Sequence, residues 1–127
     1  MITYVARTDS IEIAVQPVWL DGQSSPMEKK FAFGYYITIA NNSLRDVQLL
    51  RRHWFINDAN GKIQEVEGEG VIGQQPVIRP GESHSYNSYC ILETFSGSME
   101  GTYLMEWENG ERFRAVIPQF LLKAAAN

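Results

Sequence analysis

Apolar and more polar residues alternate with a period of two along most of this chain. The clearest row is Phe31, Phe33, Tyr35, Ile37 and Ile39, with Ala, Gly, Tyr and Thr at the positions between. Because successive side chains of a strand point to opposite faces of a sheet, this alternation predicts β-strands with one buried face. No stretch shows the i, i+3, i+4 spacing of a capped amphipathic helix. The pattern therefore restricts the chain to an all-β fold.

Turn signals divide the alternating residues into about seven strands between residues 10 and 118. The sequences DANGK (58–62) and ENGE (108–111) contain Asn-Gly, which suits the positive φ angles of tight hairpins. Short strands with regular turns are typical of an antiparallel β-sandwich of the immunoglobulin or fibronectin type III kind. Trp54 on the third expected strand fits the core Trp of such sandwiches, and Tyr103, two residues before Met105, fits a tyrosine corner.

Composition limits the classes of partner and the cellular setting. The 127 residues, 44% of them hydrophobic, are enough for a single domain over 1–127 with its own core. The net charge of −4 argues against a nucleic acid or an anionic membrane as partner. One cysteine, Cys90, excludes an internal disulfide, and the N-terminus has no signal-peptide pattern. No apolar run is long enough to span a bilayer, so we expect a soluble cytoplasmic protein.

The glycines of GEGVIG, Gly68, Gly70 and Gly73, have the spacing of a dinucleotide-binding loop. Such a loop needs a helix after it, whereas QQPVIRPG follows here, and its two prolines oppose a helix. The context therefore argues against a dinucleotide fold. Two readings stay open: the glycines shape a loop that crosses between sheets, or their amides form a nest for a small anion.

Charged residues flank these glycines on two expected strands. Arg51 and His53 share one strand face, opposite Arg52 and Trp54, and could bind phosphate beside the glycine loop, or could simply be solvated. Three glutamates spaced by two precede or interrupt the loop. They could hold a divalent cation, or could protect an edge strand from aggregation. These glutamates are Glu65, Glu67 and Glu69.

No arrangement typical of a nucleophile or an acid–base pair stands out in the sequence. His84 and His53 lie on different expected strands, and Cys90 alternates with apolar residues as a core residue would. We therefore expect a binding module rather than an enzyme, and we expect no cofactor.

Several segments together resemble the ApaG (CorD) family of bacterial proteins. They are RRHW, DANG, VEGEGVIGQQP, PGESHSY and GSMEGTY, and the resemblance extends from about Ile11 to Phe120. It implies an immunoglobulin or fibronectin-III-like sandwich in a small cytoplasmic protein, with the glycine motif at Gly68, Gly70 and Gly73. It also implies a link to cobalt and magnesium tolerance. Similar modules occur in eukaryotic F-box proteins, which suits binding better than catalysis.

Three functional hypotheses follow from the sequence. The first is a non-enzymatic module that recognises a protein partner or a small phosphate-containing anion, with strand addition and a homodimer as possible modes of association. The second is a weak metal-dependent phosphohydrolase or nucleotide binder that uses the glycine loop and the three glutamates. The third is a divalent-cation sensor or buffer that uses the same glutamates. An enzyme would require these groups to converge in one pocket, whereas a binding module would not.

Overall fold

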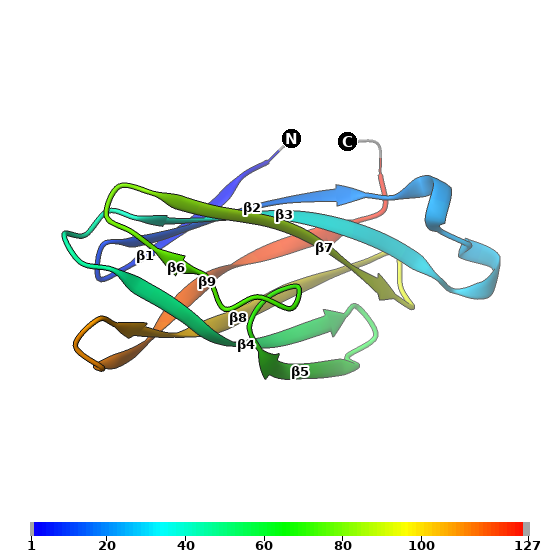
Figure 1. Cartoon of the computed structure of the whole chain (residues 1–127). Coiled ribbons are helices and arrows are strands. Elements are labelled where there is room, and N and C mark those ends of the chain that lie inside the picture. The colour runs from blue at the N-terminus through cyan, green and yellow to red at the C-terminus, as the bar shows by residue number, and fades with distance from the viewer. Residues whose placement is uncertain (1, 126–127) are drawn as a thin grey trace.

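The computed structural model describes residues 2–125, which form two antiparallel sheets packed face to face (Figure 1). One sheet has the strand order β1-β2-β3-β7. The other has the order β5-β4-β8-β9, with β6 also paired to β4. The strands are β1 (Tyr4–Thr8), β2 (Ile11–Trp19), β3 (Phe31–Asn41), β4 (Val47–Asp58), β5 (Ile63–Glu69), β6 (Val77–Ile78), β7 (Ser83–Leu92), β8 (Ser96–Trp107) and β9 (Arg112–Lys123). The predicted all-β sandwich is confirmed.

The described residues contain two strands beyond the about seven expected. β1 lies before the first expected strand and pairs with β2, and β6 is a two-residue strand beside β4. The sheet formed by β2, β3 and β7 faces the sheet formed by β5, β4, β8 and β9, as in a fibronectin type III-like sandwich. Only short 3-10 turns, η1 (Asp21–Gln23) and η2 (Pro26–Glu28), interrupt the β structure. No helix in the described part of the chain could cross a membrane.

The core between the sheets is built around aromatic rings. Trp54 is 3% exposed and meets Tyr103 and Phe120 edge to face, which confirms its predicted core position. Tyr103 is fully buried, but its hydroxyl hydrogen-bonds the hydroxyl of Tyr86 on the opposite sheet. The predicted tyrosine corner is therefore wrong, because that motif bonds the hydroxyl to nearby backbone.

A β-bulge in β4 changes which residues face the core. Against β8, Leu49 pairs with Met105 and Arg52 with Tyr103, so the register shifts between Leu49 and Arg51. Odd-numbered Val47 and Leu49 are buried before the shift, and even-numbered Trp54 and Ile56 are buried after it. The extra residue thus rotates the second half of β4 by one position, as bulges do.

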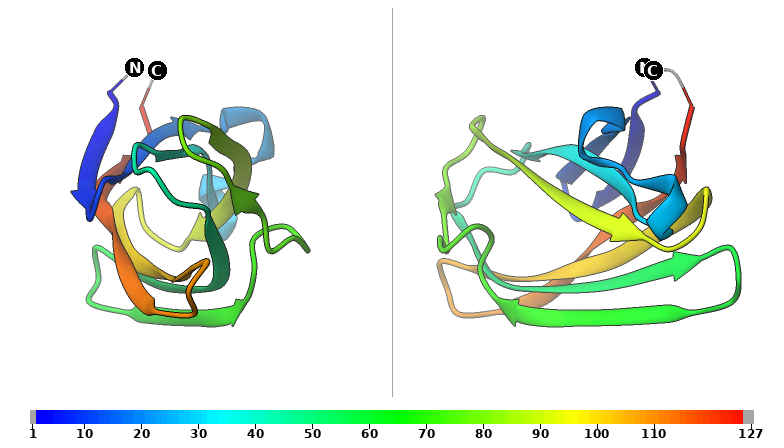
Figure 2. Two further views of the ribbon diagram at one scale, coloured as in Figure 1. Left: turned by 60° about the vertical axis from the view of Figure 1, so that its left-hand side comes forward. Right: turned by 90° about the vertical axis from the view of Figure 1, so that its right-hand side faces the viewer.

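The two sides of the sandwich differ. On one side β1 lies beside β9, where the Val116 amide donates to Thr8 Oγ1 at 3.1 Å (Figure 2). On the other side the edge strands are β7 of one sheet and β5 of the other. This second side positions the candidate site.

Candidate functional site: a cleft between the two sheets

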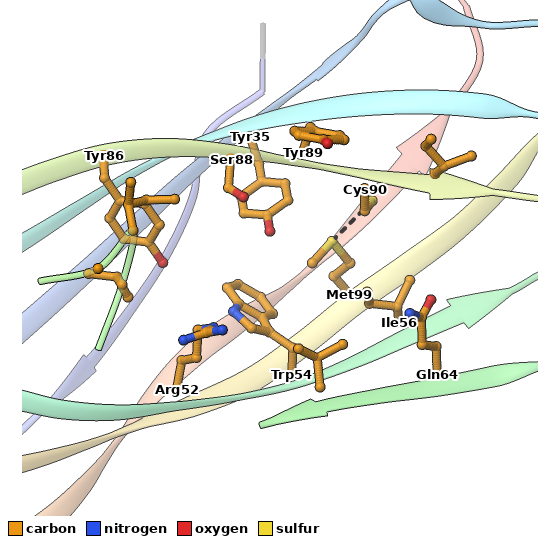
Figure 3. Close-up of a pocket in the computed structure, with 15 residues that line it drawn as sticks. Tyr35, Arg52, Trp54, Ile56, Gln64, Tyr86, Ser88, Tyr89, Cys90 and Met99 are labelled. Atoms are coloured by element: carbon orange, nitrogen blue, oxygen red, sulfur yellow. Dashed lines mark hydrogen bonds between the residues drawn. The ribbon is translucent and has the colours of Figure 1, made fainter. Parts of the chain in front are cut away.

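A cleft of about 500 Å³ opens between the sheets on the side of β7 and β5 (Figure 3). Its walls are largely apolar and aromatic, and its polar groups include a guanidinium, phenols, a carboxamide and a serine hydroxyl. Apolar walls with a few convergent polar groups are typical of ligand sites. The lining includes Tyr35 of β3, Arg52, Trp54 and Ile56 of β4, Val66 of β5, Val71 and Gly73 of the following loop, Tyr86, Ser88 and Cys90 of β7, and Met99 of β8.

Arg52 supplies the positive charge of the cleft. The bulge in β4 places it on the same inward face as Trp54 and Ile56, and Figure 3 shows it beside Trp54 and across from Tyr86. Its Nη1 donates to the carbonyl oxygens of Glu69 at 2.8 Å and Gly70 at 3.0 Å. These two bonds hold the guanidinium beside the backbone of Glu69 and Gly70, within the glycine loop.

The remaining donors of Arg52 are available to a ligand. Among the described residues, no acceptor is bonded to its Nε or Nη2, and no carboxylate oxygen lies within 4.0 Å of it. Fully buried charges are normally paired, and this half-buried guanidinium has two carbonyl oxygens but no carboxylate as partners. The remaining N–H groups of the guanidinium form a planar fork of donors, which matches the oxygens of a carboxylate or phosphate.

The phenols and the thiol of the cleft are held in their neutral forms. Burial raises the pKa of Tyr35 and of Tyr86 above the usual tyrosine range, although side-chain hydrogen bonding to Ser88 and Tyr103, respectively, and to a smaller degree the Arg52 charge, partly opposes this. Burial also raises the pKa of Cys90 to about 12, and its thiol donates to Met99 Sδ at 3.6 Å. The phenols can therefore donate hydrogen bonds to a bound anion, while the thiol is not a nucleophile near neutral pH.

The glycine loop closes one end of the cleft and is docked on the bulge of β4. The Leu50 carbonyl at the bulge accepts from the Gly70 amide at 2.8 Å and from Gln75 Nε2 at 2.9 Å. The loop then forms a tight turn in which Val71 and Gln74 exchange backbone bonds, and β6 follows instead of a helix. The context argument against a dinucleotide fold is consistent with this geometry.

Two of the glycines have specific structural roles. A Cβ at Gly68 would lie 3.0 Å from Arg52 Nη2, so the absence of a side chain makes room for the guanidinium. Gly70 has φ +63°, and a Cβ there would lie 2.2 Å from the Gln74 carbonyl oxygen. The motif thus shapes the loop around Arg52, while the Gly70 amide itself is occupied by the bond to Leu50.

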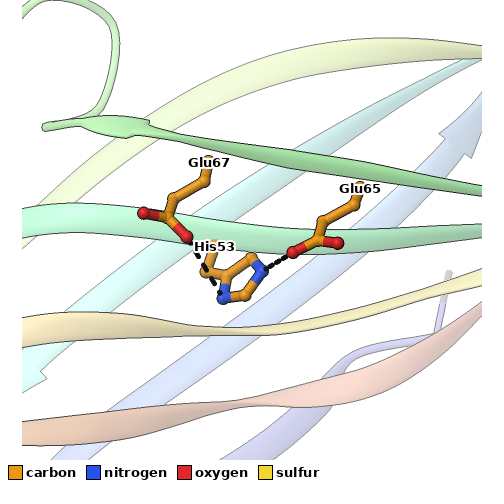
Figure 4. A group of neighbouring side chains, drawn as sticks. All are labelled: His53, Glu65 and Glu67. Atoms are coloured by element: carbon orange, nitrogen blue, oxygen red, sulfur yellow. Dashed lines mark hydrogen bonds and ion pairs between the residues drawn. The ribbon is translucent and has the colours of Figure 1, made fainter.

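Arg51 and His53 lie on the outer face of the second sheet, away from the cleft. His53 Nε2 lies 2.7 Å from Glu65 Oε2, and His53 Nδ1 lies 3.8 Å from Glu67 Oε2 (Figure 4). Arg51 Nη2 lies 3.3 Å from Glu67 Oε1. Both residues that were predicted to bind an anion thus lie beside carboxylates, and the charge of Arg51 is compensated by Glu67. Ligand atoms of His53, Glu65 and Glu67 all lie within 4.8 Å of one another, a spacing that one metal ion could bridge.

The structure separates the residues that the sequence analysis had grouped. Gly73 lines the cleft, Arg51 and His53 join the outer glutamates, and the ligand group at His53 does not include Glu69. The sequence analysis did not select Arg52, Tyr86 or Ser88. A signal for Arg52 was present in RRHW, because alternation places Arg52 on the same strand face as the buried Trp54.

Comparison with known proteins agrees with this architecture. The model of the ApaG domain matches residues 21–107. Proteins named Protein ApaG from Brucella canis and Paramagnetospirillum magneticum are 50% and 51% identical over 119 residues, which is 94% of this chain and 92% of each relative. A crystal structure described as an ApaA protein from Bordetella pertussis is 37% identical, with a TM-score of 0.87 and 97% of both chains covered. The chain therefore belongs to the ApaG domain family.

Proposed function

We propose that this protein is a binding module whose inter-sheet cleft accepts an anionic group attached to an apolar or aromatic moiety. One observation carries the proposal: the half-buried Arg52 guanidinium faces an aromatic cleft and has no carboxylate partner in the described part of the chain. A bound carboxylate or phosphate would supply that partner, and the apolar walls would bind the attached group.

A binding role is favoured over phosphohydrolysis by where the polar groups lie. Metal-assisted hydrolysis needs a cation site, a base and substrate-binding groups in one place. The described residues that line the cleft include no Asp or Glu, and His53, Glu65 and Glu67 lie on the opposite face of β4 and β5. The groups that such an enzyme would require are divided between two faces of a sheet.

The test is an affinity comparison with three small probes. Phenyl phosphate and phenylacetate carry an anionic and an apolar part, and benzyl alcohol is the neutral control. We expect saturable shifts of the Trp54 indole and of the β7 amides with both anions, and about tenfold weaker binding or none with benzyl alcohol. Equal affinity of all three probes would show that the anionic group, and therefore Arg52, does not contribute to binding.

Neighbouring arginines provide a matched control. Arg52→Gln should weaken binding of phenyl phosphate at least tenfold, whereas Arg51→Gln should leave it unchanged because Arg51 faces the other side. Arg52→Lys keeps the charge but loses the fork, so intermediate affinity is expected. Loss of binding in Arg51→Gln instead would favour the outer face and the original grouping of Arg51 with His53.

A second candidate function is binding of a divalent cation at His53, Glu65 and Glu67. The specific observation is the mutual approach of their ligand atoms within 4.8 Å on neighbouring strands. An imidazole with two carboxylates suits a borderline ion such as Zn²⁺ better than Mg²⁺. Because His84 is the second of two histidines, Zn²⁺ should broaden or shift the His53 ring resonances and leave those of His84 unchanged. Equal responses would indicate non-specific binding.

A further inference from the structure

β7 is an edge strand whose outer backbone groups have no partner. It pairs with β3 on one side over Ser83–Leu92 and is the last strand of its sheet. Among the described residues, the backbone of 83–92 makes no hydrogen bond beyond those to β3. Such an edge can accept another strand through main-chain hydrogen bonds.

The devices that usually prevent strand addition are present at the other edges and missing from β7. The β5 edge carries Glu65, Glu67 and Glu69, and β9 contains Pro118 and lies against β1. β7 is ten residues long and contains no proline, Lys, Arg, Asp or Glu. Of the two strands that border the cleft, β7 is therefore the one that can accept an acidic chain.

The edge of β7 runs along the cleft. Tyr86, Ser88, Cys90, Tyr89 and Ile91 all border the cleft, and of these Tyr89 and Ile91 are 68% and 50% exposed. A strand added to β7 would place successive side chains on opposite faces of the sheet. One set of its side chains would enter the cleft toward Arg52, and the other would contact Tyr89 and Ile91.

We propose that the ligand of this cleft is an extended acidic peptide, which adds to the sheet beside β7 and directs an Asp or Glu side chain to Arg52. The inference rests on the proposed function, since it uses the same guanidinium. A second copy of this chain fits less well, because antiparallel pairing of β7 with another β7 brings no carboxylate to Arg52. An acidic peptide would give hydrogen-bond partners to the outer backbone groups of β7 and a counter-charge to the Arg52 guanidinium.

The probe is a synthetic acetylated and amidated heptapeptide, Thr-Val-Thr-Glu-Thr-Val-Thr. One control peptide has Gln in place of Glu, and another carries N-methyl groups on alternate amides, which removes donors on one edge. We expect the Glu peptide to slow hydrogen exchange of alternate amides in 83–92 and to leave 63–69 unchanged. The Gln peptide should bind about tenfold more weakly, and the peptide with its pairing edge methylated should not bind.

Three outcomes would overturn the inference. The first is an affinity of the N-methylated peptide equal to that of the unmethylated Glu peptide, which would show that the main chain is not used. The second is protection of the β7 amides without peptide together with a dimer in sedimentation, which would identify a second copy as the occupant. The third is no response to the peptide at millimolar concentration. If phenyl phosphate still binds through Arg52 in that case, strand addition fails while the proposed cleft stands.

Discussion

The positions of individual side chains decide what this cleft can bind. Arg52 and Arg51 are adjacent in sequence and chemically identical, yet one faces the cleft and the other pairs with Glu67 outside. The sequence analysis placed them on opposite faces correctly from simple alternation. Alternation does not show that Arg51 is paired with Glu67 of the neighbouring strand, and for that reason Arg51 was wrongly favoured over Arg52 as the residue of the cleft.

The glycines of the loop should respond unequally to alanine. Gly73 has φ +71° and open space around it, so Gly73→Ala should cost about 1 kcal/mol from backbone strain. Gly70→Ala adds a clash with the Gln74 carbonyl, so its loss of unfolding free energy should be larger. Urea unfolding of both variants measures the difference. Equal losses would contradict the tight turn described here.

The Cys90 thiol should be unreactive in the native protein. Burial raises its pKa to about 12, so the thiolate that attacks disulfide reagents is scarce at pH 8. We expect slow reaction with Ellman's reagent in buffer and rapid reaction in urea. Rapid reaction of the folded protein would show that the cleft exposes this sulfur.

At the scale of elements, the strand alternation and turns were predictable, and the irregularities were not. Asn-Gly turns and the row from Phe31 to Ile39 indicate strands and hairpins locally. The bulge in β4, the short β6 and the pairing of β1 depend on which strands become neighbours. The bulge matters most for function, since it turns Arg52 inward and offers the Leu50 carbonyl to the loop.

The contact between β8 and β4 gives a further prediction. A Cβ at Gly101 would lie 2.1 Å from the His53 carbonyl oxygen, so Gly101→Ala must push two central strands apart. We expect a loss of about 2 kcal/mol or more in unfolding free energy. Gly22→Ala, with nothing within 4 Å of the added carbon, is the control and should have little effect. Similar urea midpoints for the Gly101 and Gly22 variants would contradict the close approach of β8 to β4 at Gly101.

For the whole molecule, stability should fall in alkaline solution. Burial raises the pKa values of Cys90, Tyr35, Tyr86 and Tyr103, so the folded state keeps protons that the unfolded chain releases. The contribution of each such group to the free energy of unfolding is complete below the pKa that the group has in the unfolded chain. It is lost as pH rises toward the higher pKa that the group has in the folded protein. For Cys90 that window is pH 9.0 to about 12, and each raised group contributes at most about 1.4 kcal/mol per pH unit.

Urea midpoints from pH 7 to 11 measure this effect. The wild-type midpoint should be flat to about pH 8.5 and then decline, because thiol ionisation in the unfolded chain begins there. In Cys90→Ala the decline should start about one pH unit higher, when the phenols begin to ionise. A midpoint that rises with pH above 9 would have the wrong sign for buried acids.

The central claim is that the sandwich presents Arg52 between its sheets as the anchor for an anion. The most direct measurement is a crystal structure of the protein soaked with phenyl phosphate. We predict phosphate oxygens within hydrogen-bond distance of the Arg52 guanidinium, with the phenyl ring among the apolar walls of the cleft. A phosphate bound at Arg51 and His53, with the cleft empty and Arg52 turned away, would contradict the account.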